Sequence, residues 1–132
     1  MNRREVLIMG AAATLLAGRA GAEMLEYTPG LVDQRLADGE TLFVDFYASW
    51  CSTCRSQGRT IQALRDANPA YDEGMTFVKV DWDVHSGSAL SQRLQIPRRS
   101  TLVVLRGEEE LGRIVAGTRE ADIRALMDRG LA

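Results

Sequence analysis

The distribution of apolar residues along the chain separates buried strands from amphipathic helices. Residues 41–47 are apolar on both alternating faces except at Asp45, which is typical of a strand at the centre of a covered sheet. Residues 52–67 instead carry apolar side chains at helical spacing and end at Asn68-Pro69, because the residue before a proline disfavours helix. A buried strand followed directly by a helix is therefore predicted here.

The remaining segments complete an alternating order of strands and helices. We expect a short helix over residues 31–37, strands over 75–80, 101–105 and 111–116, a short helix over 86–94, and a last helix capped by Thr118 and stopped by Gly130. A tight turn at Arg106-Gly107 makes the last two strands antiparallel, whereas any parallel pair needs a helical crossover such as residues 52–67. The order predicts an α/β fold with one mixed sheet and helices on both faces.

The first 22 residues have the pattern of an export leader. Arg3 and Arg4 precede an apolar run over residues 6–18, and Ala20-Gly21-Ala22 forms an A-x-A cleavage signal. The run is too short to span a bilayer, so no stable membrane span is expected. Residues 2–8 resemble the twin-arginine export signal, although Val6 and Ile8 depart from it and leave the general export route open. We expect residues 1–22 to be a signal peptide and residues 23–132 to form one domain, located in the periplasm.

Charge and composition narrow the classes of partner. The 132 residues are 45% hydrophobic and 26% charged, which suits one ordinary globular core. Without residues 1–22 the chain has 13 basic and 17 acidic residues, a net charge of −4. Nucleic acid is therefore not an expected partner.

Both cysteines of the chain lie in Trp50-Cys51-Ser52-Thr53-Cys54, where the buried strand meets the next helix. A helix N-terminus presents unpaired N–H groups and a positive dipole, which stabilise a thiolate at Cys51 and lower its pKa. Cys54 lies one turn further on the same side and can attack a mixed disulfide formed at Cys51. We expect Cys51 to be the attacking thiol and Cys54 the resolving thiol, with Arg55 adding positive charge nearby.

Asp45 and Trp50 are the other candidates near this pair. A carboxyl in the middle of an apolar strand has a pKa raised by desolvation, so Asp45 could accept the proton of Cys54. A buried acid paired with Lys79 is the structural alternative, and the two roles are compatible. Trp50 is expected to shield the thiols and shape a docking surface, with a core tryptophan as the alternative.

Other uses of the two cysteines remain open. Zinc normally takes four ligands, and the chain offers two cysteines and one histidine, His85. A structural disulfide between positions three apart would close almost no loop and stabilise little. A copper-binding delivery module using both thiols with His85 or Met75 is a different class of function, as is a redox-inert interaction domain. No cofactor is expected.

The segment Val44 to Cys54 resembles the active-site strand and motif of the thioredoxin family, and the order of elements matches that fold over about residues 26–130. The resemblance implies that a buried acid at Asp45 assists the resolving thiol and that Lys79 lies near this acid and tunes it. It also implies a thiol–disulfide oxidoreductase acting on partner proteins, with electrons supplied by a membrane thiol transporter. We expect a reductant or electron carrier, with a disulfide-forming oxidant as the alternative.

One position departs from the family. Thioredoxins have a cis-proline directly before the third strand of this series, where this chain has Ser100, and Pro97 falls three residues earlier. A cis bond before a residue other than proline costs about 3 kcal/mol, so Ser100 is either trans or strained. Ser100 and Trp50 are the expected substrate-binding residues. Arg98 and Arg99 flank the site, either as a solvated loop or as a contact for an acidic partner.

Overall fold

The computed structural model describes residues 23–132. The expected leader over residues 1–22 lies outside the described residues. The strands are β1 (Leu25–Glu26), β2 (Thr41–Tyr47), β3 (Thr76–Asp81), β4 (Thr101–Arg106) and β5 (Glu109–Val115). The helices are α2 (Leu31–Ala37), α3 (Ser52–Ala67), α4 (Ala70–Gly74), α5 (Trp82–His85), α6 (Ala89–Arg93) and α7 (Glu120–Arg129).

The five strands form one mixed sheet in the order β1-β3-β2-β4-β5. β3 is parallel to both β1 and β2, whereas β4 is antiparallel to β2 and to β5. β2 is thus the central strand, with Asp45 opposite Lys79 on one side and opposite Leu102 on the other. The predicted mixed sheet and the antiparallel pairing of the last two strands are confirmed.

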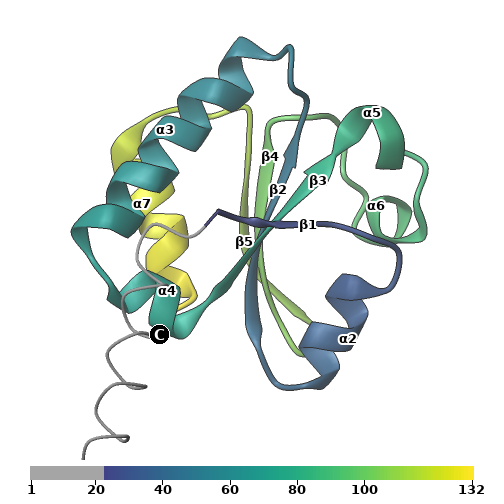
Figure 1. Cartoon of the computed structure of the whole chain (residues 1–132), viewed down its shortest axis with the longest axis horizontal. Coiled ribbons are helices and arrows are strands. Elements are labelled where there is room, and N and C mark those ends of the chain that lie inside the picture. Colours follow the sequence, from purple (N-terminus) through teal and green to yellow (C-terminus); the bar gives the residue numbers. More distant parts are fainter. Residues whose placement is uncertain (1–22) are drawn as a thin grey trace, which may run out of the picture.

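Helices cover both faces of the sheet, with α3, α4 and α7 on one side and α2, α5 and α6 on the other (Figure 1). Each face buries its own apolar core. Phe43 of β2 packs with Ile61 of α3 and Ile123 of α7, whereas Phe46 packs with Val32 of α2 on the opposite side. The alternation in β2 therefore places the Phe43 and Asp45 face beneath α3, as expected for a strand that feeds this helix.

The described chain contains three short elements that periodicity did not predict, namely β1, α4 and α5. They are two to five residues long, too short to produce a repeating pattern. The predicted cap of the last helix was wrong, because Arg119 occupies the N-cap position of α7 and makes no side-chain cap hydrogen bond. Gly130 does end α7, with right-handed φ and ψ.

Among residues 23–132, no helix is both long and apolar enough to cross a membrane. The longest described helix, α3, has 16 residues.

Candidate active site

Cys51 lies at the carboxyl end of the sheet, where β2 leads into α3. It is the N-cap residue of α3, and its Sγ accepts a hydrogen bond of 3.1 Å from the backbone N–H of Cys54. Both cysteines are free thiols and almost fully buried, at 3% and 5% exposure. The predicted placement of the two thiols on one side of a helix N-terminus is confirmed.

The two thiols are electrostatically unequal. Burial raises the pKa of Cys51, but hydrogen bonds from Cys54, Ser100 and Arg99 outweigh this effect and lower the pKa to about 7. Burial raises the pKa of Cys54, and its hydrogen bond to Cys51 raises it further. Near neutral pH, Cys51 is therefore the thiol that ionises first, which makes it the better nucleophile. Arg55, which was expected to add positive charge near the pair, donates a hydrogen bond of 3.2 Å to the carbonyl of Ser49.

Ser100 places its hydroxyl against both sulfur atoms. Its Oγ lies 3.3 Å from Cys51 Sγ and 3.1 Å from Cys54 Sγ. The described residues contain no cis peptide bond, and Ser100 adopts a left-handed φ of 66°. Its backbone N–H donates to the carbonyl of Phe46 at 2.7 Å. Proline can neither adopt this φ nor donate this bond, so serine suits the backbone found here. Ser100, and not Pro97, contacts the thiols.

Gln57 is a site residue that the sequence interpretation missed. It is fully buried in α3, and its Nε2 donates to the carbonyl oxygens of Ser100 at 3.0 Å and Gly117 at 2.9 Å. The bond to Ser100 ties this residue, which contacts both thiols, to helix α3. The available signal was a polar residue on the stripe that continues through Ile61 and Leu64, where an apolar side chain would be expected.

Trp50 and Arg99 form the outer edge of the site. The Trp50 side chain is 57% exposed, so the alternative of a core tryptophan is wrong. Its indole N–H donates to Asp83 at 2.9 Å, and the Arg99 guanidinium carbon lies 4.4 Å above the ring centre. Arg99 thus stacks on an aromatic face and interacts with Cys51, so it is not simply part of a solvated loop.

Asp45 is buried behind the thiols at 5% exposure, and its Oδ1 has no hydrogen-bond partner in the structure. Burial raises its pKa from 3.8 to about 7, the charge of Cys51 raises it too, and Lys79 opposes both. Lys79 is the register neighbour of Asp45, but its ammonium pairs with Glu26 at 3.8 Å and lies over the Tyr47 ring. Lys79 therefore acts on Asp45 through its charge rather than through a direct ion pair.

The structure does not bring the proposed additional copper ligands to the thiols. The His85 ring packs edge-on against Tyr27, with ring centres 4.9 Å apart, and Met75 is buried in the core beneath α3 and α7. Within the described part of the chain, no three histidine, cysteine or acidic side chains form a group that could hold a metal ion.

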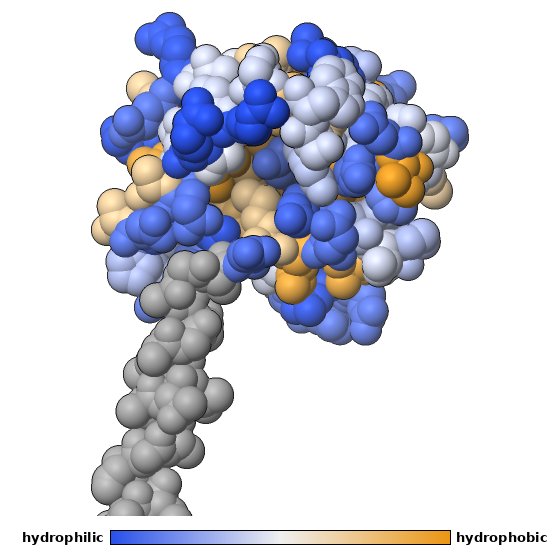
Figure 2. Space-filling model, turned by 45° about the horizontal axis from the view of Figure 1, so that its top comes forward, coloured by the Kyte–Doolittle hydropathy of each residue, from blue (hydrophilic) through white to orange (hydrophobic). Residues whose placement is uncertain are grey.

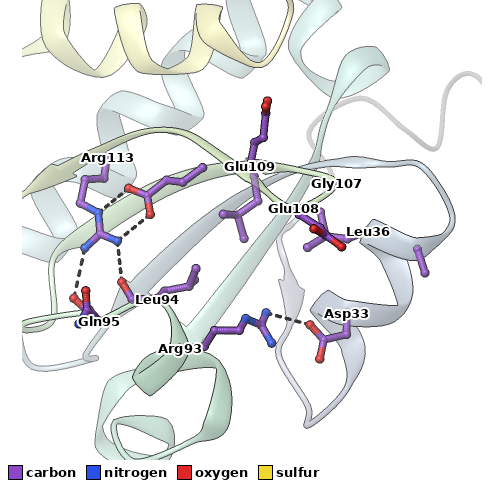
Figure 3. Close-up of a pocket in the computed structure, with 12 residues that line it drawn as sticks. Asp33, Leu36, Arg93, Leu94, Gln95, Gly107, Glu108, Glu109 and Arg113 are labelled. Carbon is purple, nitrogen blue, oxygen red and sulfur yellow. Dashed lines mark hydrogen bonds and ion pairs between the residues drawn. The ribbon is translucent and has the colours of Figure 1, made fainter.

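A separate pocket of about 890 Å³ lies between α2, α6 and the β4–β5 hairpin (Figure 3). It is at the end of the sheet where β2 begins, opposite the thiols. Two ion pairs cross its wall, Arg93 with Asp33 at 2.9 Å and Arg113 with Glu110 at 2.6 Å. Neither cysteine lines this pocket, so it does not contribute to the site at the thiols.

The surface above the thiols is mainly hydrophilic. Figure 2 brings forward the end of the molecule where β2 leads into α3, and it shows apolar side chains only as small patches between polar and charged ones. Around the buried thiols this end therefore offers a partner mainly polar groups together with the exposed ring of Trp50.

Comparison with known proteins agrees with this geometry. The family model described as Thioredoxin matches residues 24–129. The chain is similar to the thioredoxin of Echinococcus granulosus, with 33% identity over 90 residues that cover 67% of this chain and 78% of that protein. It is also similar to thiol:disulfide interchange protein DsbD 2 of Pseudomonas aeruginosa, with 27% identity over 83% of this chain but only 20% of that protein.

A solved structure gives the same result. The crystal structure of Trxlp from Edwardsiella tarda EIB202 is similar with a TM-score of 0.66 and 30% identity, covering 80% of this chain and 96% of that one. The chain belongs to the thioredoxin family and is a thiol–disulfide oxidoreductase that carries its C-x-x-C motif at Cys51 and Cys54.

Proposed function

We propose that this protein is an exported, periplasmic reductant that passes electrons to the disulfides of partner proteins. The observation that carries the proposal is the unequal pair of thiols at the N-terminus of α3, where hydrogen bonds lower the pKa of Cys51 and burial raises the pKa of Cys54. The buried Asp45 lies close enough for its pKa to be raised by the charge of Cys51. A membrane thiol transporter is the proposed electron donor. The leader pattern of residues 1–22 supports the location.

In the first step, the Cys51 thiolate attacks one sulfur of the partner's disulfide. A bond forms between Cys51 and this sulfur, the partner's disulfide breaks, and the other partner sulfur leaves as a thiolate. Hydrogen bonds from Ser100 and from the backbone N–H of Cys54 hold the Cys51 thiolate ready for this attack.

In the second step, Cys54 loses its proton and attacks Cys51. The mixed disulfide breaks, a disulfide forms between Cys51 and Cys54, and the second partner sulfur leaves as a thiolate. Solvent protonates the two partner thiolates, and the partner is released in its reduced dithiol form. Asp45 is the proposed proton acceptor, because its raised pKa makes it a base near neutral pH and it lies on the sheet face beneath α3. Lys79 would tune this acid through its charge.

The depth of the pKa shift favours a reductant over an oxidant. Strong disulfide-forming oxidants stabilise their reduced form through a thiolate with a pKa near 3.5, whereas thioredoxin-type reductants have a pKa of about 7. The Cys51 pKa of about 7 belongs to the second group. This supports a reduced form that is less stabilised than that of a strong oxidant.

The reduction potential tests the direction of electron flow. We expect equilibration with glutathione to give roughly −270 to −220 mV, and the protein to reduce insulin disulfides. The Cys51→Ser variant should be inactive in the same assay. A potential near −120 mV would instead identify a disulfide-forming oxidant.

A trapping experiment tests the partner class and the location together. In cells, Cys54→Ser should accumulate mixed disulfides with periplasmic proteins, while the matched Cys51→Ser variant should accumulate none. Fractionation of the same cells should place the processed chain in the periplasm. Retention of the unprocessed chain in the cytoplasm would contradict export, and an empty trap would count against protein disulfides as substrates.

A further inference from the structure

Arg99 is a cation at the edge of the active site that lacks an acidic partner. Its side chain is half-buried, and its Nε is buried without a hydrogen-bond partner. Among the ion pairs of residues 23–132, none involves Arg99. The anion that it does meet is the Cys51 sulfur when this is ionised.

The position of the guanidinium is fixed by its neighbours. It stacks on the Trp50 ring at 4.4 Å, and the indole N–H of Trp50 is held in turn by Asp83 at 2.9 Å. None of the ion pairs found in residues 23–132 joins Asp83 to Arg99. An arginine whose guanidinium lies over an aromatic ring can still offer N–H donors at its edge to a planar acceptor such as a carboxylate.

Thiol exchange changes the charge that Arg99 faces. Before the attack, Cys51 carries a negative charge. Once its sulfur has bonded to the partner's sulfur it is neutral, so the half-buried guanidinium loses its anion while the partner is still attached. A buried or half-buried charge without a partner is unfavourable. A carboxylate supplied by the attached partner would remove this penalty.

We propose that Arg99 selects protein partners that carry a carboxylate next to the cysteine that Cys51 attacks. This inference rests on the proposed exchange of disulfides with proteins. The carboxylate replaces the Cys51 thiolate as the anion of Arg99 in the mixed disulfide, and Trp50 supplies the exposed apolar face on which the adjacent partner residue lies. No electrons beyond those of the exchange itself are involved.

Three synthetic peptides of the same sequence test this proposal. Each contains one intramolecular disulfide, and the residue beside the more exposed cysteine is glutamate, glutamine or lysine. We expect the reduced protein to reduce the glutamate peptide about tenfold faster than the glutamine peptide, and the lysine peptide most slowly. Peptide thiols are counted by chromatography after acid quenching.

Two variants with the same change in net charge separate Arg99 from general electrostatics. Arg99→Gln should bring the ratio of the glutamate to the glutamine rate close to one. Arg59 is an exposed residue of α3 and forms none of the ion pairs in the described chain. The Arg59→Gln variant should therefore leave the ratio unchanged. The ratio is used rather than the absolute rate, because loss of Arg99 also raises the pKa of Cys51 and slows every peptide.

The wild-type protein supplies an independent readout should Arg99→Gln fail to fold. The preference for glutamate should shrink as ionic strength rises, because salt screens a partly exposed charge pair. Equal rates for the glutamate and glutamine peptides would overturn the proposed selectivity of Arg99, and so would a preference that survives in Arg99→Gln. Neither result would affect the proposed reductase function. Failure to reduce any peptide would instead overturn the proposed reductase function.

Discussion

The Nε2 atom of Gln57 lies 3.0 Å from the carbonyl oxygen of Ser100, which ties the active-site helix to the residue facing both thiols. The same nitrogen also reaches the carbonyl of Gly117 at 2.9 Å. One amide group in α3 thus holds two segments that are 43 and 60 residues away along the chain.

Replacing Gln57 with leucine should loosen this connection with little change in volume. Gly117 loses its donor, whereas the Ser100 carbonyl still accepts a bond from the N–H of Ala116. We expect the free energy of unfolding to fall by about 1–2 kcal/mol, measured by urea denaturation of the reduced protein. Gln62→Leu on the same helix, where the side chain bonds only the exposed Asp66, should cost less than about 0.5 kcal/mol.

Removal of the Ser100 hydroxyl should raise the pKa of Cys51 above about 7, because this hydroxyl is one of the groups that stabilise the thiolate. A hydrogen bond of about 1 kcal/mol corresponds to an increase of somewhat less than one pKa unit in Ser100→Ala. The rate of alkylation by iodoacetamide, followed between pH 5 and 10, reports this midpoint. The control is Ser91→Ala, which removes a buried hydroxyl from α6 on the opposite face of the sheet. An equal rise in the pKa of Cys51 in this variant would show that the effect of Ser100 is not local.

The buried Asp45 should make the reduced protein less stable as the pH rises from about 4 to about 7. Its carboxyl has an ordinary pKa near 3.8 in the unfolded chain and about 7 in the folded chain. Well below pH 3.8 both states are protonated and the group has no effect. Between the two values the unfolded chain ionises first, so the folded state loses at most roughly 4 kcal/mol.

The variant Asp45→Asn tests this slope because it keeps the shape and removes the titration. Its free energy of unfolding should vary less between pH 4 and 7 than that of the wild type, as measured by denaturant titration at each pH. Glu108→Gln, in the exposed turn between β4 and β5, should retain the wild-type slope. If the free energy of unfolding changed with pH equally in the wild type and in Asp45→Asn, the pKa of Asp45 would not be raised in the folded protein.

Loss of the Lys79 charge should raise the pKa of Asp45 further, since this ammonium is the group that lowers it. Carbon-13 NMR of the Asp45 carboxyl in Lys79→Met should show a midpoint above that of the wild type. Arg93→Met, which removes a cation at the opposite end of the sheet, serves as the control. An unchanged midpoint in Lys79→Met would mean that Glu26 already neutralises this lysine completely.

The sequence by itself determined the central strand, the long helix and the thiol pair between them. These features are local: burial on both faces leaves a continuous apolar run, and helix geometry places residues three apart on one side. The departure at Ser100 was also visible, because it interrupts a motif at a known distance from a strand.

Only the tertiary structure decided what surrounds the sulfur atoms. Gln57, Arg99 and Ser100 reach the thiols or one another through contacts between residues more than 40 positions apart, and no local pattern encodes such contacts. Lys79 is a further example. It lies opposite Asp45 in the paired strands, but its ammonium forms an ion pair with Glu26, which the sequence did not indicate. Hydrophobic patterning sets which side chains are buried, whereas the packing of the elements sets which polar groups meet.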